Sequence, residues 1–466
     1  MARDEELCFT SAARLAAMIA LREISPVEVM DAVLARAERL EPSLNMFAMP
    51  LFDRARTAAQ AAEAAVMRGG ALGALHGVPI TIKDNVPMAG LPMCNGSVAL
   101  ADFVPPRDAV VVERVAQAGA ICIGKTNLPE FAHKVLTDSP KFGVTRSPWS
   151  LDRTPGGSSG GASAALAAGI APIAIGTDGG GSIRCPAACT GVAGLKATLG
   201  RIPFEAMPEA FANYAFVGPM TRTVEDIPLL LSVMSGAAPD DPYSLATPPF
   251  VPRPRENPAR GLRVAWIERF GAVAPEPAVA DLTAAAVRML QGQGAQVETP
   301  SVPEFADVFD TYVVIATTAH AARLESVAQK WGDRLTPSIR ESIARGLTYS
   351  AAEWQRASDR RTVLFRAVQR LFERFDLIVT PTMTAPAKPL DAGGSIASAM
   401  YAEWAGYLYP FNLTGHPAMS VPCGFTAEGL PVGLQLIGPW FGEQRMIDVA
   451  TALENAGRWS ERRPGI

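Results

Sequence analysis

The sequence reads Thr154-Pro-Gly-Gly-Ser-Ser-Gly-Gly161 and then, after an alanine-rich run, Gly176-Thr-Asp-Gly-Gly-Gly-Ser-Ile-Arg-Cys-Pro186. Each of these two glycine clusters holds a serine, Ser158 in the first and Ser182 in the second. Glycine admits positive φ angles and leaves peptide N–H groups uncovered, so that they can face a ligand. One such loop is a weak signal. Two loops with a hydroxyl each, joined by a helix and a strand, indicate a functional site.

The segments around the clusters alternate between strand and helix patterns. Residues 160–169 are small and predict a helix, and residues 172–176 predict the strand that leads into the second cluster. Upstream, residues 77–84 have the two-residue period of a strand, and a helix over 108–119 leads to a short apolar strand over 121–123. This repeated order predicts an α/β architecture.

The pattern continues downstream without a clear linker or an internal repeat. Residues 238–260 are rich in Pro and Asp and predict a long surface excursion. We therefore expect a single domain over residues 1–466, built on one large sheet, with a peripheral helical region at about 238–375. Further helices are expected at 25–40, 53–68, 223–236, 277–292, 304–328, 350–375 and 442–456, and further strands at 262–267, 376–380, 419–422 and 432–437.

The composition is that of a folded protein with a large apolar core. The 466 residues are 48% hydrophobic and 19% charged, and their mean hydropathy is +0.15. A formal net charge of −4 gives no electrostatic case for nucleic acid, and the lack of an uncharged apolar run of roughly 18 residues predicts no membrane span. The acidic first residues lack the apolar core of a signal peptide. The six scattered cysteines fit reduced thiols in the cytoplasm, and none has the spacing of a zinc site.

The glycine clusters fit poorly to the common glycine-rich nucleotide sites. A P-loop requires a lysine after its last glycine, and the match to a dinucleotide fingerprint is poor. Residues 156–160 do satisfy Gly-x-Ser-x-Gly, the nucleophile elbow of α/β-hydrolases. However, loop-like residues 148–155 stand where that motif needs a buried strand, and His416 would have to be its histidine. Glycine-rich turns without chemistry are the remaining alternative.

Taken together, the two clusters resemble the signature of the amidase signature family. The resemblance covers roughly residues 25–455, with a signature core at about 70–225. It implies an α/β fold with a single large mixed β-sheet covered by helices on both faces. The other matching segments are residues 76–85, 124–131, 218–223, 380–382 and 431–438.

The resemblance also implies a Ser–cis-Ser–Lys triad. In this sequence Ser182 matches the nucleophile, Ser158 the bridging serine and Lys83 the base. The peptide bond between Gly157 and Ser158 is expected to be cis. No metal or cofactor is implied.

The loop around the nucleophile is expected to bind the oxyanion of the reaction. The resemblance implies that the backbone N–H groups of Gly179, Gly180, Gly181 and Ser182 form this oxyanion hole. The family usually has Thr or a similar residue where Gly179 stands, so the wall of the site is expected to be smaller here.

Three further residues are expected to support these loops. Asp178 and Arg184 flank the nucleophile and are interpreted as an ion pair or hydrogen-bond frame. Ser159 is expected either to support Ser158 or to cap the helix that begins at Gly160, and both roles stay open.

The proposed base must lose its proton to act. A free lysine has a pKa of about 10.4, and lowering it by ~3 units requires the ammonium to be disfavoured by roughly 4 kcal/mol. Burial in an apolar core can do this. The residue pattern alone favours a solvent-exposed lysine at a strand edge for Lys83, whereas the family resemblance favours a buried one.

The substrate pocket is the least defined part of the site. Several apolar residues are candidates for its lining but fit the protein core equally well, and both interpretations stay open. If they line the pocket, a neutral and partly apolar amide is favoured over a charged one. These residues are Met93, Cys94, Phe131, Tyr401, Trp404, Tyr407 and Tyr409.

The predicted function is hydrolysis of a small-molecule carboxylic acid amide to an acid plus ammonia or an amine. The alternative is the glutaminase (A-type) subunit of a glutamyl-tRNA(Gln) amidotransferase, which shares the fold and triad but passes ammonia to a partner subunit. That protein typically has Gln after the Ile-Arg of the nucleophile loop, where this chain has Cys185. A catalytically inactive binding protein is a third hypothesis, which the complete triad disfavours. The oligomeric state stays open, with a homodimer as one option.

Overall fold

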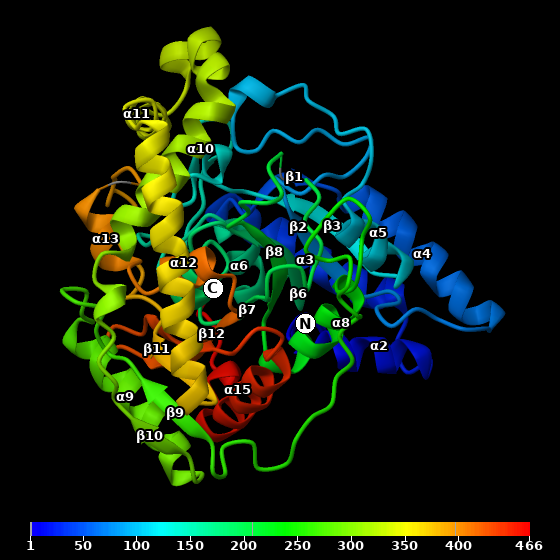
Figure 1. Ribbon diagram of the computed structural model, residues 1–466. Helices are drawn as coiled ribbons and strands as arrows, with labels where there is room; N and C mark the ends of the chain where they lie inside the picture. Colours follow the sequence, from blue (N-terminus) through cyan, green and yellow to red (C-terminus); the bar gives the residue numbers. More distant parts are fainter. Residues whose placement is uncertain (1, 207, 397) are drawn as a thin grey trace.

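A mixed sheet of eleven strands runs through the centre of the molecule in the computed structural model, which describes residues 2–206, 208–396 and 398–466 (Figure 1). A separate two-stranded ladder joins β4 (Asp138–Ser139) and β5 (Gly143–Val144). In spatial order the strands of the large sheet are β1 (Phe47–Pro50), β3 (Ile121–Thr126), β2 (Pro79–Lys83), β6 (Ile173–Asp178), β8 (Phe216–Thr221), β7 (Ala193–Lys196), β12 (Ala418–Phe425), β13 (Pro431–Ile437), β11 (Leu377–Pro381), β9 (Arg263–Trp266) and β10 (Gln296–Glu298). Strands β3, β2 and β6 are parallel to one another, as are β11, β9 and β10, and the strands between these groups pair antiparallel.

Helices cover both faces of the sheet, because its strands are apolar on both faces. Along β11, Leu377 and Val379 belong to one core cluster, whereas Ile378 between them belongs to the other. The first cluster includes residues of α2 (Ala12–Ala20), α3 (Pro26–Leu44), α4 (Phe52–Arg68), α5 (Val110–Gln117), α8 (Ile227–Met234), α9 (Pro277–Gly292) and α15 (Glu443–Gly457). The second includes residues of α7 (Arg184–Thr190), α10 (Val308–Trp331), α12 (Ala351–Arg374), α13 (Ala399–Trp404) and α14 (Tyr409–Thr414). The predicted α/β fold with helices on both faces is confirmed.

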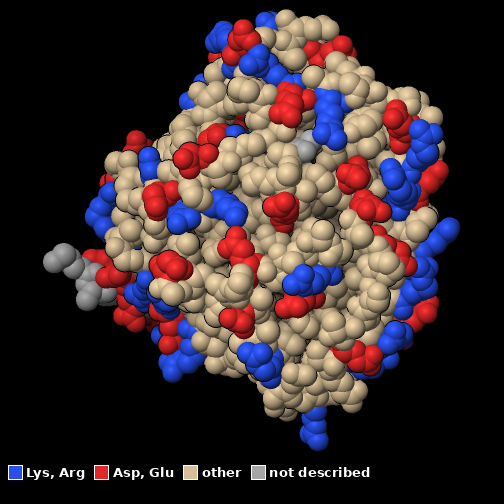
Figure 2. Space-filling model, turned by 90° about the vertical axis from the view of Figure 1, so that its left-hand side faces the viewer, with Lys and Arg blue, Asp and Glu red and all other residues tan. Residues whose placement is uncertain are grey.

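Two further helices pack on members of these layers. The short helix α1 (Ala2–Cys8) packs on α3, and α11 (Pro337–Gly346) packs on α10. Figure 1 shows α10 and α11 together at the top of the molecule, with the long α12 crossing in front of the sheet. On the face drawn in Figure 2, acidic and basic side chains are interspersed and neither sign gathers in one large patch.

The site predicted from the sequence lies where β2 and β6 end. These strands are parallel neighbours, with Ile82 opposite Ile175, so their carboxyl ends meet on the same side of the sheet. Lys83 is the last residue of β2, and Asp178 is the last residue of β6. Ligand sites of open α/β sheets form beyond such strand ends. Helix α6 (Gly160–Ala167), which follows the first glycine cluster, packs on both strands.

The predicted helices and strands are confirmed, with ends displaced by a few residues, and α9 has the predicted bounds. No helix or strand of the described chain falls within residues 238–260. The region at about 238–375 does contribute two strands, β9 and β10, to one edge of the sheet. None of the helices in the described ranges is long and apolar enough to cross a membrane.

Several elements were not anticipated. Strands β7 and β8 are buried along their whole length, so their sequences lack the polar–apolar alternation that marks a half-exposed strand. Helix α7, which begins two residues after Ser182, spans only seven residues and is too short to show a helical period.

Candidate active site

The amine of Lys83 is enclosed at the carboxyl end of β2. Its Nζ lies 2.7 Å from Ser158 Oγ and 2.9 Å from Thr177 Oγ1, and the side chain is 0% exposed. Burial lowers the pKa of Lys83 well below that of an ordinary lysine, and this outweighs the opposing effect of nearby Asp178. The solvent-exposed lysine favoured by the residue pattern alone is therefore wrong, because the sheet continues on both sides of β2 and covers it.

The neighbours of this amine suit its neutral form. A neutral amine has two N–H groups and one lone pair. The hydroxyl oxygen and the carbonyl oxygen of Thr177, at 2.9 Å and 3.5 Å, accept the two N–H groups. The lone pair is then left for the hydroxyl of Ser158, at 2.7 Å. Asn85 Nδ2 donates to the same Thr177 hydroxyl oxygen at 3.0 Å and fixes its position.

The first glycine cluster presents Ser158 to the lysine. The Gly157–Ser158 peptide bond is cis, as expected from the family resemblance. A side chain at Gly157 would meet the backbone of residues 135–136 at 2.9–3.0 Å, so only glycine lets the chain pass there. Ser159 supports the loop: its N–H donates to the Ser182 carbonyl at 3.1 Å, and its Oγ contacts the N–H and carbonyl of Thr177 at 3.3 and 3.2 Å. Its side chain makes no capping hydrogen bond to α6, so the capping role is excluded.

The second cluster presents Ser182 to the same cavity as Ser158. The Ser182 side chain is largely buried, and within the described part of the chain its hydroxyl makes no hydrogen bond. Among the four expected oxyanion donors, Gly181 is different, because its N–H donates to Asp178 Oδ1 at 2.7 Å. The N–H groups of Gly179, Gly180 and Ser182 make no hydrogen bond in the described ranges. Of the four expected oxyanion donors, these three are therefore free to bind an oxyanion.

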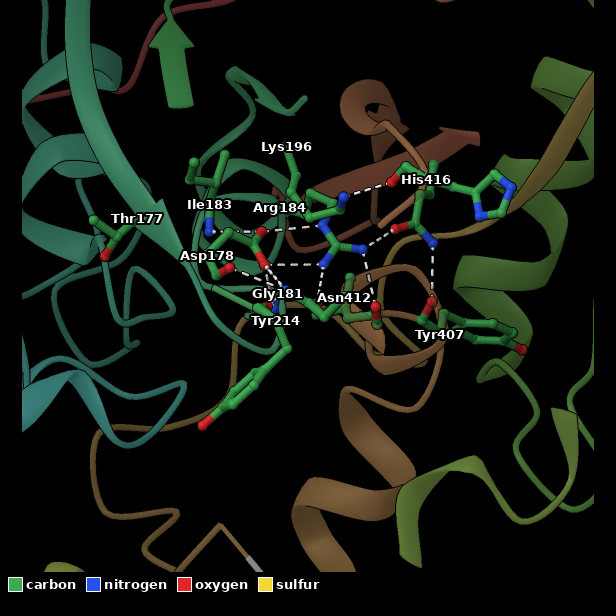
Figure 3. Close-up of polar contacts among 12 residues, drawn as sticks. Thr177, Asp178, Gly181, Ile183, Arg184, Lys196, Tyr214, Tyr407, Asn412 and His416 are labelled. Atoms are coloured by element: carbon green, nitrogen blue, oxygen red, sulfur yellow. Dashed lines mark hydrogen bonds and ion pairs between the residues drawn. The ribbon is translucent and has the colours of Figure 1, made fainter. Parts of the chain in front are cut away.

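Asp178 and Arg184 form the expected frame (Figure 3). Arg184 Nε and Nη2 each lie 3.0 Å from one carboxylate oxygen of Asp178, and both side chains are completely buried. Burial alone would raise the pKa of Asp178, but the charge and hydrogen bonds of Arg184 hold it well below its usual range. The carboxylate also accepts the N–H groups of Gly181 and Ile183, at 2.7 and 3.2 Å. The ion pair therefore sets the shape of the loop that carries Ser182.

Two residues far along the chain complete this frame and were missed by the sequence analysis. Arg184 donates to Asn412 Oδ1 at 2.5 Å and to Gln435 Oε1 at 2.7 Å. Asn412 Nδ2 in turn donates to the Asp178 carboxylate at 2.8 Å. The only signal in the sequence was an uncharged polar residue inside an apolar segment. Such a signal does not show which distant residue the side chain contacts. The same holds for Thr177, whose contact with Lys83 could not be read from the sequence either.

A cavity of about 470 Å³ opens above Ser158 and Ser182. Among the residues left open between pocket and core, four line this cavity: Met93, Phe131, Tyr401 and Tyr409. Three belong to the surrounding protein instead: Cys94, Trp404 and Tyr407. At Gly179 a side chain would meet only Ala215 and Tyr214, at 3.9 and 4.0 Å, so the loop has room on that side.

The cavity carries positive charge and no negative charge among its described lining residues. These include Arg107, Lys134 and Arg323 but neither Asp nor Glu. Arg107 pairs with Asp240 at 2.9 Å, and Lys134 pairs with Asp138 at 2.5 Å. The rest of the lining is mainly aromatic and aliphatic. The cavity therefore suits an apolar or anionic substrate better than a cationic one.

None of the four histidines makes a hydrogen bond to Ser158 or Ser182 in the described chain. His416 stacks on Phe372 with ring centroids 5.5 Å apart and does not line the cavity, which removes the nucleophile-elbow hypothesis. His133 and His320 do line it. Each is held by a serine of α11: His133 Nε2 lies 2.7 Å from Ser338 Oγ and His320 Nδ1 lies 2.7 Å from Ser342 Oγ.

Comparison with known proteins agrees with this geometry. The family model described as "Amidase" matches residues 28–447. The chain is 36% identical to the A-type subunit of the glutamyl-tRNA(Gln) amidotransferase of Chloroflexus aggregans, with 99% of each chain covered. A bacterial aryl acylamidase of the amidase signature family superposes with a TM-score of 0.88 at 29% identity, covering 97% of each chain. The crystal structure of the corresponding amidotransferase subunit from Thermotoga maritima gives a TM-score of 0.77 at 29% identity, covering 92% of this chain and 91% of that one.

Proposed function

The chain belongs to the Amidase family, and from this premise we propose that it hydrolyses a carboxylic acid amide through an acyl-enzyme on Ser182, with Ser158 as relay and Lys83 as base. The observation that carries this proposal is the 2.7 Å contact between the buried Lys83 amine and the Ser158 hydroxyl, beside a cavity that Ser158 and Ser182 both line. An amine held neutral by burial can accept a proton that an ordinary lysine at neutral pH cannot.

The reaction proceeds in two halves. In the first, Lys83 takes the proton of Ser158 while Ser158 takes that of Ser182, and Ser182 Oγ attacks the amide carbonyl. The N–H groups of Gly179, Gly180 and Ser182 stabilise the oxyanion. The proton returns along the relay to the leaving nitrogen, which departs as ammonia or an amine. In the second half, water attacks the acyl-enzyme by the same route and releases the acid.

As to which amide is cleaved, the relatives favour the glutaminase subunit of an amidotransferase over the stand-alone amidase that the sequence analysis put first. The Chloroflexus aggregans relative, the A-type component of a glutamyl-tRNA(Gln) amidotransferase, matches over nearly its full length. Several further relatives of the same name match at 36–38% identity. In this form of the proposal the amide is that of glutamine, and a partner subunit receives the ammonia.

A stand-alone amidase is the second candidate, and the cavity favours it. Glutamine carries an α-ammonium group, which needs a carboxylate or a set of acceptors when it is buried. The described lining of the cavity offers cations and apolar side chains but no carboxylate. Cys185 stands where the amidotransferase protein typically has Gln, and it is fully buried.

A single comparison separates the two candidates. The purified chain alone is assayed for ammonia release from glutamine and from a panel of uncharged alkyl and aryl amides, with Ser182→Ala as the blank. Turnover of simple amides without a partner supports the stand-alone amidase, and glutaminase activity that rises on adding a partner subunit supports the amidotransferase. If Ser182→Ala releases ammonia as fast as the unmodified protein, the assignment of the nucleophile is wrong.

A further inference from the structure

One face of α10 forms a wall of the cavity. Tyr312, Ala316, His320 and Arg323 recur at intervals of four, four and three residues, which places them on one side of the helix, and all four line the cavity. The helix starts at the nucleophile loop, since a side chain at Gly180 would meet the Tyr312 hydroxyl at 2.1 Å. At a rise of about 1.5 Å per residue, the Cα of Arg323 lies ~16 Å further along the helix axis than the Cα of Tyr312.

Arg323 nevertheless lines the same cavity as Ser158 and Ser182. Long side chains on a helix lean toward its amino terminus, which here is the end at the nucleophile loop. Arg323 is half-buried and lies close enough to Tyr214 to lower the pKa of that phenol against the stronger effect of burial, which raises it. Tyr214 in turn lies 4.0 Å from the side-chain position of Gly179. The charge of Arg323 therefore acts on a residue that lies beside the loop carrying Ser182.

Arg323 is also the unpaired cation of this wall. The other two cations of the described lining are neutralised by Asp240 and Asp138. Within the part of the chain that the structure describes, Arg323 makes no ion pair and no hydrogen bond. A half-buried guanidinium with five N–H donors and no acceptor suits a planar oxyanion.

His320 adds a polar group beside it. Its Nδ1 contacts Ser342 Oγ at 2.7 Å, which orients the ring and leaves Nε2 without a partner in the described chain. Burial lowers the pKa of His320 to about 4, so the ring is neutral at neutral pH. It can share a hydrogen bond with a ligand, and Arg323 supplies the charge.

From this arrangement we propose that Arg323, assisted by His320, binds a carboxylate of the substrate. This inference rests on the proposed function: the substrate is an amide whose acyl or amine part carries a carboxylate, separated from the reacting carbonyl by an apolar spacer that contacts the aromatic wall. An ammonium group at the same place is disfavoured.

The test uses chromogenic amides in matched pairs. The 4-nitroanilides of succinate, glutarate and adipate monoacids are compared with alkanoyl 4-nitroanilides of equal acyl length, and the 4-aminobutanoyl 4-nitroanilide places an ammonium where the glutarate compound has its carboxylate. The unmodified protein is expected to prefer one carboxylate member over its uncharged partner and to turn over the ammonium-bearing amide least. Arg323→Gln is expected to lower that preference, expressed as a ratio of kcat/KM values, about 10- to 100-fold and mainly through KM.

Two further variants and one binding measurement make the result decisive. Arg323→Lys is expected to keep part of the preference, and Arg345→Gln, the same charge change at an exposed position on α11 outside the cavity, is expected to keep all of it. A ratio that is the same in the unmodified protein and in Arg323→Gln overturns the proposal. If none of these amides is cleaved and neither glutamine nor the uncharged amides release ammonia, the proposed function fails. Binding of the dicarboxylate monoamides, measured by calorimetry, tests the role of Arg323 independently of turnover. Equal affinity of the unmodified protein and Arg323→Gln for these compounds overturns the inference.

Discussion

The hydroxyl oxygen of Thr177 lies 2.9 Å from the amine of Lys83, and the two residues come from neighbouring parallel strands. This contact orients the amine, because it occupies one N–H and leaves the lone pair toward Ser158. Thr177→Val removes the acceptor while keeping the shape of the side chain. Losing one buried hydrogen bond costs about 1–3 kcal/mol, so we expect kcat to fall roughly 10- to 100-fold. Thr177→Ser keeps the oxygen, and equal rates for the two variants would show that the contact does not position the base.

Lys83→Met is expected to remove activity and to stabilise the fold at neutral pH. Loss of a general base typically costs about 10²–10⁴-fold in kcat. The pKa of Lys83 is lowered in the folded state, so below the pKa of the unfolded chain, about 10.4, the unfolded state binds more protons. The unmodified protein therefore loses stability as pH falls below that value, and the methionine variant does not.

Denaturant titrations of both proteins between neutral pH and pH of about 10 measure this difference. We expect the methionine variant to be the more stable at neutral pH and the gap to close as the pH rises. A gap that is constant over the whole range would mean that Lys83 is charged in the folded protein.

Ser182→Ala and Ser158→Ala should differ in what they abolish. Removal of the nucleophile of a serine triad costs roughly 10⁶-fold in kcat. Because the Ser182 hydroxyl makes no hydrogen bond within the described residues, its loss should leave the unfolding midpoint unchanged, whereas Ser158→Ala also removes the hydrogen bond to Lys83. Mass spectrometry after mixing with a slow amide should show an acyl adduct on the unmodified protein and none on Ser182→Ala. An adduct of the same mass on Ser182→Ala would place the nucleophile elsewhere.

Asp178→Asn should lower the free energy of unfolding by about 3–5 kcal/mol, because it leaves the buried charge of Arg184 uncompensated. Arg184→Met leaves the complementary charge and should cost a similar amount. The double variant removes both charges and should lose less than the sum of the two single variants. Denaturant unfolding of the four proteins provides the test, and additive losses would show that the pair is not coupled.

Gly180 and Gly179 are adjacent but should tolerate alanine very differently. A Cβ at Gly180 would lie 2.1 Å from the Tyr312 hydroxyl, whereas one at Gly179 would lie at ordinary contact distance from its neighbours. Gly180→Ala displaces an expected oxyanion donor and should lower kcat about 10²–10³-fold, while Gly179→Ala should stay near the unmodified rate. A Cβ at Gly180 would also lie 2.6 Å from Tyr312 Cζ, so Tyr312→Leu, which removes both the hydroxyl and that ring carbon, should partly rescue Gly180→Ala. Failure of rescue would show that the loop is displaced for another reason.

The sequence predicted most of the framework of this protein. Helix α9 begins and ends where the residue pattern places it, and α3 and α12, which open with capping boxes at Ser25 and Ser350, begin within a residue of the predicted starts. These features depend on side chains within a few residues of one another, so local propensity and periodicity are enough to reveal them. Strands β7 and β8 were not predicted, because burial on both faces removes the polar–apolar alternation by which a strand is recognised.

By itself, the sequence determined the α/β order of elements, the two glycine loops and, through the family resemblance, which three side chains are candidates for catalysis. Only the tertiary structure decided that Lys83 is buried against Thr177, that the Gly181 amide is taken by Asp178, and that Arg323 faces the cavity without a partner in the described chain. The physical reason is that desolvation and hydrogen-bond pairing depend on which distant segments meet. Arg184, for example, finds its acceptors at Asn412 and Gln435, more than two hundred residues away along the chain. The pattern of residues next to Arg184 contains no information about these long-range contacts.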